Sequence, residues 1–209
     1  MSRLIPTIQP HKGHSTEFRA RKDSEGLIQC SITLTHHGED DDQTEIGRLE
    51  GIIVPDTNSF REFYDHMDNY SSDAEVVASA LEPSLRSGRF YDRWETTPSS
   101  PFIYVDRVEI ATEHRGKYKG YLLMHALMDF LTTLGADHVM VGLLAAPILT
   151  EEVPMEVYEA KCRSLAIYWE TFGFTKTRYK TQGLHSILVH NMSHKFPEGS
   201  WARHQGLGD

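Results

Sequence analysis

A strand, a short basic turn and a helix follow one another directly between residues 102 and 134, and this order constrains the fold most strongly. The segment FIYVDRVEIAT alternates as a strand does, and HRGKYKG leads from it into apolar residues at helical spacing. The first N–H groups of a helix lack intrahelical partners and carry the positive end of its dipole. The turn therefore either holds an anion or simply starts a helix.

The residues of this turn place positive charge at the start of the helix and allow a ligand to come close to the backbone there. Arg115, Lys117 and Lys119 are basic, while Gly116 and Gly120 permit unusual backbone angles or a near ligand. The spacing fits neither a P-loop, GxxxxGK followed by Ser or Thr, nor the dinucleotide fingerprint GxGxxG. A nucleotide site of either kind is therefore not expected.

The rest of the chain predicts an α/β domain with one mixed sheet. Two β-rich segments flank the acidic loop GEDDDQTE and so predict a hairpin, and HVMVGLLAAP is typical of a strand covered on both faces. On strand 102–112, alternation places Val105, Arg107 and Glu109 on one face and Tyr104, Asp106, Val108 and Ile110 on the other. In chain order we predict strands 27–37 and 47–56, helices 56–67 and 71–83, strand 102–112, helix 121–134, strand 138–147, helix 154–173 and strands 175–180 and 185–191.

The domain organisation follows from these elements. Residues 1–25 are polar and predict an N-terminal arm, either irregular or a short edge strand. We predict a single domain over 26–193 and a C-terminal tail over 194–209. Whether Trp201 docks this tail on the body or forms a contact in a homodimer is open.

Composition limits the function classes. The net charge is −9 with scattered Lys and Arg, which disfavours a nucleic-acid partner. No apolar run is long enough to span a bilayer and the start lacks a secretory signal, so we expect a cytoplasmic protein with no membrane partner. Cys30 and Cys162 predict two buried thiols. His36 and His37 would point to opposite faces of a strand, and we expect no metal site.

Two stretches carry a resemblance to a known family. VEIATEHRGKYKGYLL resembles the acyl-CoA binding motif of the GNAT acyltransferase superfamily, in which Arg or Gln is followed by two residues, Gly, one residue, and Gly or Ala. LAIYWETFGFTKT resembles the family's later motif, an aromatic helix that runs into Gly-Phe and a strand. The resemblance covers roughly 102–178. It implies a GNAT-like mixed, mostly antiparallel sheet flanked by helices, with a V-shaped splay between strands 102–112 and 138–147.

The same resemblance implies where acetyl-CoA, the expected co-substrate, would bind. It assigns the pantetheine arm to the strand residues Val108, Glu109 and Ile110. It assigns the pyrophosphate to the turn and the helix start, namely Arg115, Gly116, Lys117, Tyr118, Lys119, Gly120 and Tyr121.

Three positions depart from the family's pattern. Tyr118 replaces the first glycine of the motif, which either lowers CoA affinity or supplies a ring that stacks on the cofactor. Trp169 replaces the helix tyrosine that often protonates the CoA thiolate. Gly142 aligns with the strand glutamate that is a base in some relatives.

The catalytic candidates are therefore other side chains. Asp106 and Glu109 are candidate bases, and Tyr168, like Tyr104, is a candidate acid. The alternatives are a salt bridge between Asp106 and a basic group such as Arg107, a solvent-facing Glu109, and tyrosines that serve only as core aromatics. Trp169 would pack the core or wall the acyl pocket.

These features predict an acetyl-CoA-dependent N-acetyltransferase that acts on a primary amine by direct attack on the thioester. The acceptor is a small molecule such as a polyamine, or a lysine side chain or protein N-terminus. The rival is a catalytically inactive GNAT-fold module that binds CoA or a protein partner. A toxin-like acetyltransferase acting on aminoacyl-tRNA would need a basic face, which the sequence does not indicate.

Overall fold

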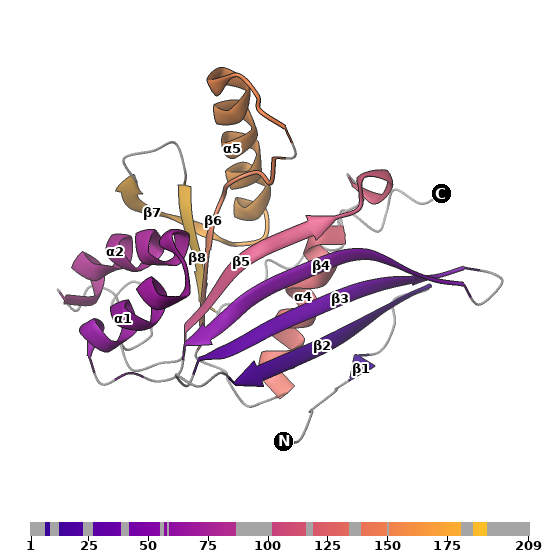
Figure 1. Ribbon diagram of the computed structural model, residues 1–209, viewed down its shortest axis with the longest axis horizontal. Helices are drawn as coiled ribbons and strands as arrows, with labels where there is room; N and C mark the ends of the chain where they lie inside the picture. The colour runs from indigo at the N-terminus through magenta and orange to yellow at the C-terminus, as the bar shows by residue number, and fades with distance from the viewer. Residues whose placement is uncertain are drawn as a thin grey trace.

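The computed structural model describes residues 7–8, 13–22, 27–38, 42–54, 57, 59–86, 102–115, 119–133, 139–149, 151–180 and 186–191. Within them, strands and helices alternate along one sheet (Figure 1). The elements are β1 (Thr7–Ile8), β2 (His14–Lys22), β3 (Ile28–His37), β4 (Gln43–Val54), α1 (Phe60–Tyr70), α2 (Ser72–Arg86), β5 (Phe102–Ile110), the 3₁₀ turn η1 (Thr112–His114), α4 (Lys119–Thr133), β6 (Met140–Leu144), α5 (Met155–Glu170), β7 (Thr175–Lys180) and β8 (Ser186–Asn191).

The eight strands form one sheet in the order β1-β2-β3-β4-β5-β6-β8-β7. The pair β5–β6 is parallel, and each other neighbouring pair among the described strands is antiparallel. This confirms the predicted mixed, mostly antiparallel sheet, and the β3–β4 pair confirms the predicted hairpin.

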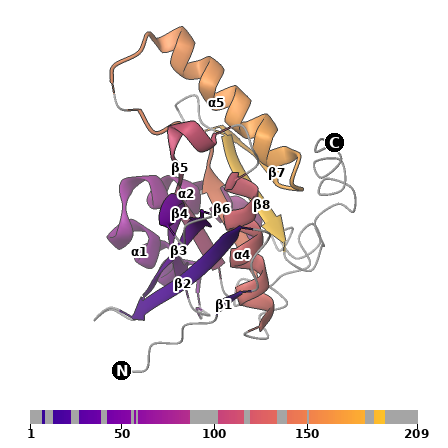
Figure 2. The same ribbon diagram turned by 90° about the vertical axis from the view of Figure 1, so that its right-hand side faces the viewer.

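Helices cover both faces of this sheet. α4 runs along one face, while α1 and α2 lie on the opposite face at one end (Figures 1 and 2). Alternation along β5 explains the two cores: Ile103 and Val105 join the cluster under α4, whereas Phe102 and Tyr104 join the cluster under α1 and α2. The sheet is thus buried on both faces where β5 and β6 pair.

The N-terminal segment contributes more to the sheet than the sequence predicted. Where we expected an irregular arm or a short edge strand, β2 is a nine-residue strand that pairs with β3 along its whole length. Phe18 is buried, and its ring stacks on Phe130 of α4 with centroids 3.4 Å apart. A single buried aromatic in a polar strand gives little periodic signal, so the sequence pattern missed it.

Several element ends also differ from prediction. β4 begins at Gln43, inside the predicted acidic loop, and β6 ends at Leu144, before the predicted end at 147. α2 continues past Pro83 to Arg86. A proline inside a helix removes one backbone hydrogen bond and crowds the preceding turn, and here only three residues of the helix follow it. Cys30 and Cys162 are buried as predicted.

Candidate active site

A β-bulge at Asp106 interrupts the ladder between β4 and β5. Glu50 and Gly51 are consecutive on β4, yet their partners on β5 are Arg107 and Val105, so Asp106 is the extra residue. The two backbones approach closely here, because a Cβ on Gly51 would lie 2.2 Å from the carbonyl oxygen of Tyr104. Glycine is therefore required at position 51.

The bulge corrects the predicted faces of β5. Val108 and Ile110 pack against the same core cluster as Val105, although strict alternation places them on the opposite face. One extra residue moves every side chain beyond it to the other face of the strand. Arg107 and Glu109 consequently lie on the face away from α4.

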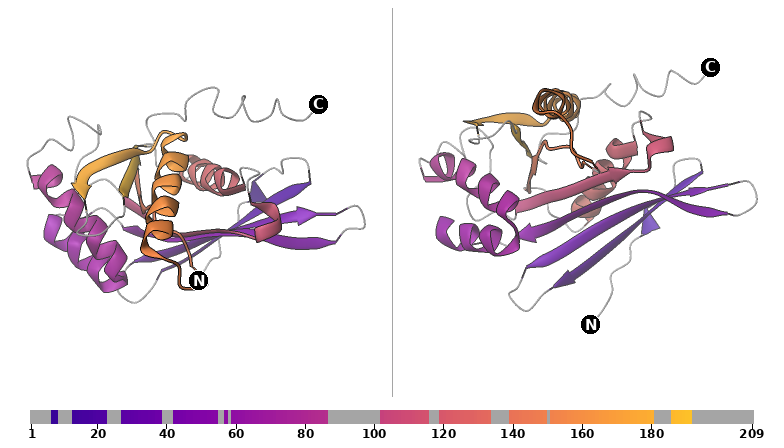
Figure 3. Two further views of the ribbon diagram at one scale, coloured as in Figure 1. Left: turned by 90° about the horizontal axis from the view of Figure 1, so that it is seen from above. Right: turned by 45° about the horizontal axis from the view of Figure 1, so that its top comes forward.

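β5 and β6 separate from the bulge onward. β6 pairs with β5 only over Phe102–Val105, while β5 continues to Ile110 (Figures 1 and 3). This is the predicted splay. A cavity of about 840 Å³ lies beside it, bounded by β5, the start of α4, the segment after β6 and helix α5.

The cavity brings together most of the predicted site residues. Those that line it are Asp106, Val108, Glu109, Ile110, Arg115, Lys119, Gly120 and Tyr168. Gly116, Lys117 and Tyr118 lie outside the described residues. Tyr121 is buried instead, with its ring 4.7 Å from that of Phe172, so its side chain belongs to the core.

A parallel strand pair that splays at a bulge, with a basic turn and a helix start at its mouth, is the arrangement implied by the two sequence motifs. This is the GNAT fold.

Comparison with known proteins found similar chains among solved structures only. No family model matches the chain, and no curated protein matches it by sequence. Among solved structures, it is similar to Arabidopsis thaliana NAA60 in complex with acetyl-CoA, with a TM-score of 0.44 and 10% identity over 79% of this chain and 77% of that one. It is also similar to a Drosophila melanogaster polyamine N-acetyltransferase, with a TM-score of 0.45 and 10% identity over 77% of this chain and 74% of that one. Likeness at this level concerns the fold and leaves the activity open.

Within the GNAT fold, Asp106 is the best-placed candidate base. It lines the cavity, and after burial its charge is the largest effect that raises the pKa of Tyr70 and that of Tyr104. Partial desolvation, the largest effect, raises the pKa of Asp106, and the nearby carboxylates of Asp73 and Glu50 raise it further. A raised pKa brings a carboxylate closer to the range in which a general base is effective.

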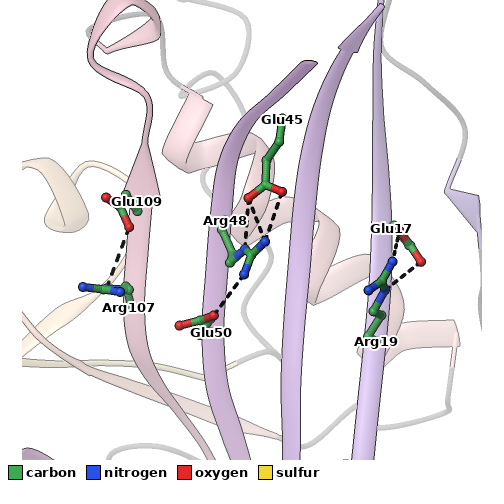
Figure 4. Close-up of polar contacts among 7 residues, drawn as sticks. All are labelled: Glu17, Arg19, Glu45, Arg48, Glu50, Arg107 and Glu109. Carbon is green, nitrogen blue, oxygen red and sulfur yellow. Dashed lines mark hydrogen bonds and ion pairs between the residues drawn. The ribbon is translucent and has the colours of Figure 1, made fainter. Parts of the chain in front are cut away.

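The position of Glu109 fits a solvent-facing residue better than it fits a catalytic base. Its carboxylate lies 3.9 Å from the Arg107 guanidinium, and both side chains are about half exposed. Figure 4 shows this pair beside a second group of ion pairs on β4, where Arg48 contacts Glu45 and Glu50. The alternative salt bridge from Arg107 to Asp106 is absent from the ion pairs among the described residues, although the charge of Arg107 partly offsets the rise in the pKa of Asp106 that burial causes.

Tyr168 remains the candidate acid. Its hydroxyl lies near the start of α4, because a Cβ on Gly120 would be 3.0 Å from it. Trp169 is buried against Phe172 and Phe174 and also lines the cavity. It therefore belongs both to the hydrophobic core and to the wall of the pocket. Tyr104 suits an acid less well, since burial and the charge of Asp106 raise its pKa.

Tyr168→Phe tests the acid role. We expect kcat for amine acetylation to fall by about 10²-fold, the lower end of what a general acid contributes. Tyr158→Phe is the matched control, because Tyr158 lies on the same helix and does not line the cavity. Equal rates for both variants would exclude Tyr168 as the acid.

The structure explains the absence of a base at Gly142. A Cβ there would lie 2.5 Å from Cζ of Phe102, so the ring of Phe102 fills the space that a side chain at 142 would enter. Comparison with the family motif shows glycine at position 142 where some relatives have a glutamate, but the sequence alone does not explain this difference.

Two residues of this region were not predicted. Tyr70, at the end of α1, places its ring 6.1 Å from that of Tyr104, and the imidazole of His14 on β2 accepts a hydrogen bond of 2.9 Å from the ammonium of Lys119. His14 and Lys119 are 105 positions apart, and no local pattern reports a contact at such a separation.

Two searches of the described residues gave negative results. No group of three or more His, Cys, Asp or Glu side chains among them is arranged to hold a metal ion. No helix in the same part of the chain has the length and apolarity needed to cross a membrane.

Proposed function

We propose that the protein is an acetyl-CoA-dependent N-acetyltransferase that acts on a primary amine. The observation that carries this proposal is the cavity at the splay, where the β5 edge, the basic start of α4, Asp106 and Tyr168 meet. Each has the chemistry that one part of the reaction requires.

The cofactor side of the cavity suits a phosphorylated thioester. Beyond Val105, β5 has no ladder partner in β6, so an extended pantetheine arm can pair with its backbone as an added strand does. Arg115 and Lys119 add positive charge beside the N-terminus of α4, which favours a pyrophosphate. Arg115 Nε also donates to the carbonyl of Ile110 at 2.9 Å and thereby ties the turn to the end of β5.

The acceptor side suits an amine that carries positive charge. The carboxylates of Asp106 and Glu109 line the cavity, and those of Asp73 and Glu50 add to the effect of burial in raising the pKa of Asp106. A site lined by carboxylates attracts cations, and it favours an amine over an anionic or apolar acceptor.

The reaction then needs two proton movements. The neutral amine attacks the thioester carbonyl, a C–N bond forms, and the C–S bond breaks with its electron pair on sulfur. Asp106 takes the proton that leaves the nitrogen, and Tyr168 gives a proton to the departing thiolate. Positioning of the two substrates supplies most of the acceleration.

A charge reversal at the turn tests the cofactor site. For Arg115→Glu/Lys119→Glu we expect acetyl-CoA affinity to fall by about 100-fold or more, since each charge-assisted hydrogen bond contributes roughly 1.5–3 kcal/mol. Both residues are accessible at the surface, whereas Gly120 is buried, so the substitutions spare the core. Isothermal titration with acetyl-CoA measures the effect, and ATP serves as the ligand control.

The matched variant is Arg163→Glu/Lys176→Glu, which makes the same change of charge at two exposed ion pairs outside the cavity. Equal affinity in both double variants would contradict the site. Tight binding of acetyl-CoA without its consumption by any amine would favour the catalytically inactive module instead.

A further inference from the structure

Three histidines from separate segments of the chain gather beside the basic turn. His14 on β2 and His36 on β3 are direct partners in the ladder, and their rings lie 4.9 Å apart. The ring of His114, on η1, lies 6.3 Å from that of His36. All three residues are half-buried, and the start of β2, the end of β3 and η1 lie at the same end of the sheet (Figure 1).

The fold places His14 and His36 on the face of the sheet that α4 covers. Alternation along β2 and β3 puts them on the same face as Phe18 and Leu34, which belong to the core cluster under α4. This row of side chains reaches the start of α4, where the ammonium of Lys119 donates a hydrogen bond of 2.9 Å to Nε2 of His14. The core-facing row therefore ends in two imidazoles beside a cation.

A hydrogen bond to the backbone fixes how His36 can act. A carbonyl only accepts, so Nδ1 of His36 donates to the carbonyl oxygen of Gly13 at 3.0 Å. Gly13 has a φ of +77°, in the left-handed region that favours glycine, and its carbonyl also accepts from the backbone N–H of His37 at 2.9 Å. His36 is thus held through Nδ1, and its Nε2 becomes a second donor when the ring takes up a proton.

The charge of this group favours an anion over a metal ion. The ammonium of Lys119 repels a metal ion, and no group of three or more metal-binding side chains among the described residues is arranged to hold one. The charged neighbours of His114 along the chain, Glu113 and Arg115, are both exposed. Histidine gains charge readily near neutral pH, and a bound anion favours the protonated imidazole, which donates from both nitrogens. A phosphate monoester, with a charge of about −1.5 to −2 and three acceptor oxygens, suits such a group.

We propose that the three histidines and Lys119 form a site for a phosphate monoester, separate from the pyrophosphate site proposed above. Lys119 also lines the cavity, so the two sites adjoin. Coenzyme A carries such a monoester on its ribose, beside the pyrophosphate, and free phosphate has the same chemistry. Where the monoester belongs to the cofactor, the inference rests on the function proposed above.

Isothermal titration with acetyl-CoA and with 3′-dephospho-acetyl-CoA tests the site. We expect the unmodified protein to bind acetyl-CoA about 10-fold more tightly than the dephospho form, the effect of one charge-assisted hydrogen bond. In His36→Gln/His114→Gln this preference should disappear, because glutamine cannot take up a proton and become a cation. Affinity for the dephospho form should not change.

Proton uptake is a second readout, which a merely structural role would not move. Titrations in buffers of different ionisation enthalpy measure how many protons bind together with the ligand. Slightly above neutral pH the phosphate is already a dianion, so the protons taken up go to the protein. Acetyl-CoA should bring more protons onto the unmodified protein than the dephospho form does, and the double variant should not show this difference.

His37→Gln is the matched control. His37 follows His36 but lies on the other face of β3, where its Nε2 hydrogen-bonds with the hydroxyl of Ser15 at 2.7 Å. Its ligand preference and proton uptake should match those of the unmodified protein. If the preference for acetyl-CoA were unchanged in His36→Gln/His114→Gln, and only its Tm fell, the histidines would merely pack this end of the sheet and the proposal would be overturned.

Inorganic phosphate separates the two sources of the ligand, and also separates this inference from the proposed function. Its binding is followed through the histidine ring signals by NMR. If acetyl-CoA does not bind but phosphate binds and the double variant loses it, the proposed function fails and the site stands. Equal affinity for the two cofactor forms, together with such phosphate binding, assigns the site to free phosphate. No preference between the cofactor forms and no binding of phosphate would overturn the inference.

Discussion

Asp106→Asn is expected to lower kcat/KM for amine acetylation by about 10²–10⁴-fold, the contribution typical of a general base. The amide keeps one acceptor oxygen and nearly the shape of the carboxylate, so the local structure should persist. It has no basic site for the amine's proton. The unmodified enzyme should lose kcat/KM as the pH falls through the raised pKa of Asp106, and the residual activity of the variant should lack this limb.

The same substitution is expected to stabilise the fold at neutral pH. The pKa of Asp106 is higher in the folded protein than in the unfolded chain, so the folded state binds the proton more tightly. The ionised carboxylate therefore destabilises the fold at neutral pH, and this cost disappears as the pH falls through the folded-state pKa. Thermal unfolding should show a higher Tm for Asp106→Asn at neutral pH, with a difference that shrinks as the solution is acidified.

Asp65→Asn is the control for both effects. Asp65 is an exposed residue of α1 whose nearest cation, Arg61, is 3.9 Å away, an interaction of little energetic weight. Its activity and Tm should match those of the unmodified protein. If Asp106→Asn retained full activity with an unchanged acidic limb, Asp106 would not be the base.

Restoring the glutamate of some relatives is expected to damage this protein. Gly142→Glu would drive a side chain into the ring of Phe102, which packs edge to face against Phe63 with centroids 5.2 Å apart. Overpacking alone costs about 1–3 kcal/mol. A buried carboxylate without a designed partner adds a further desolvation cost of several kcal/mol, a large part of the roughly 5–15 kcal/mol by which a domain is stable.

Urea unfolding of a smaller series separates these causes. Gly142→Ala should lose about 1–3 kcal/mol. Adding Phe102→Leu should recover part of that loss, because the two positions share one space and their effects do not add. Gly38→Ala is the control, since a Cβ there would lie 3.6 Å from its nearest neighbour, an ordinary contact. Equal losses at positions 38 and 142 would show that Phe102 does not exclude a side chain at 142.

The sequence by itself determined the order of the strands and α-helices from residue 27 onward, and it marked the strand, turn and helix beside which the cavity lies. The spacing of apolar residues predicts strand 102–110 and the helix after it, and the glycines and basic residues between them indicate the turn. Such signals need only neighbours along the chain. Local signals likewise predicted the hairpin and the strand after α4, whereas the residues lining the splay were expected from the resemblance to the GNAT motifs.

Only the tertiary structure decided how the site is assembled in detail. The bulge at Asp106 comes from the register between β4 and β5, and one inserted residue reverses the faces that alternation predicts. Contacts from Lys119 to His14, and from Phe102 to the space beside Gly142, join residues that the chain separates widely. Periodicity indicates which face of a strand or helix a residue occupies. Register and side-chain contacts depend instead on which strands and helices meet, and packing across the sheet determines which of them do.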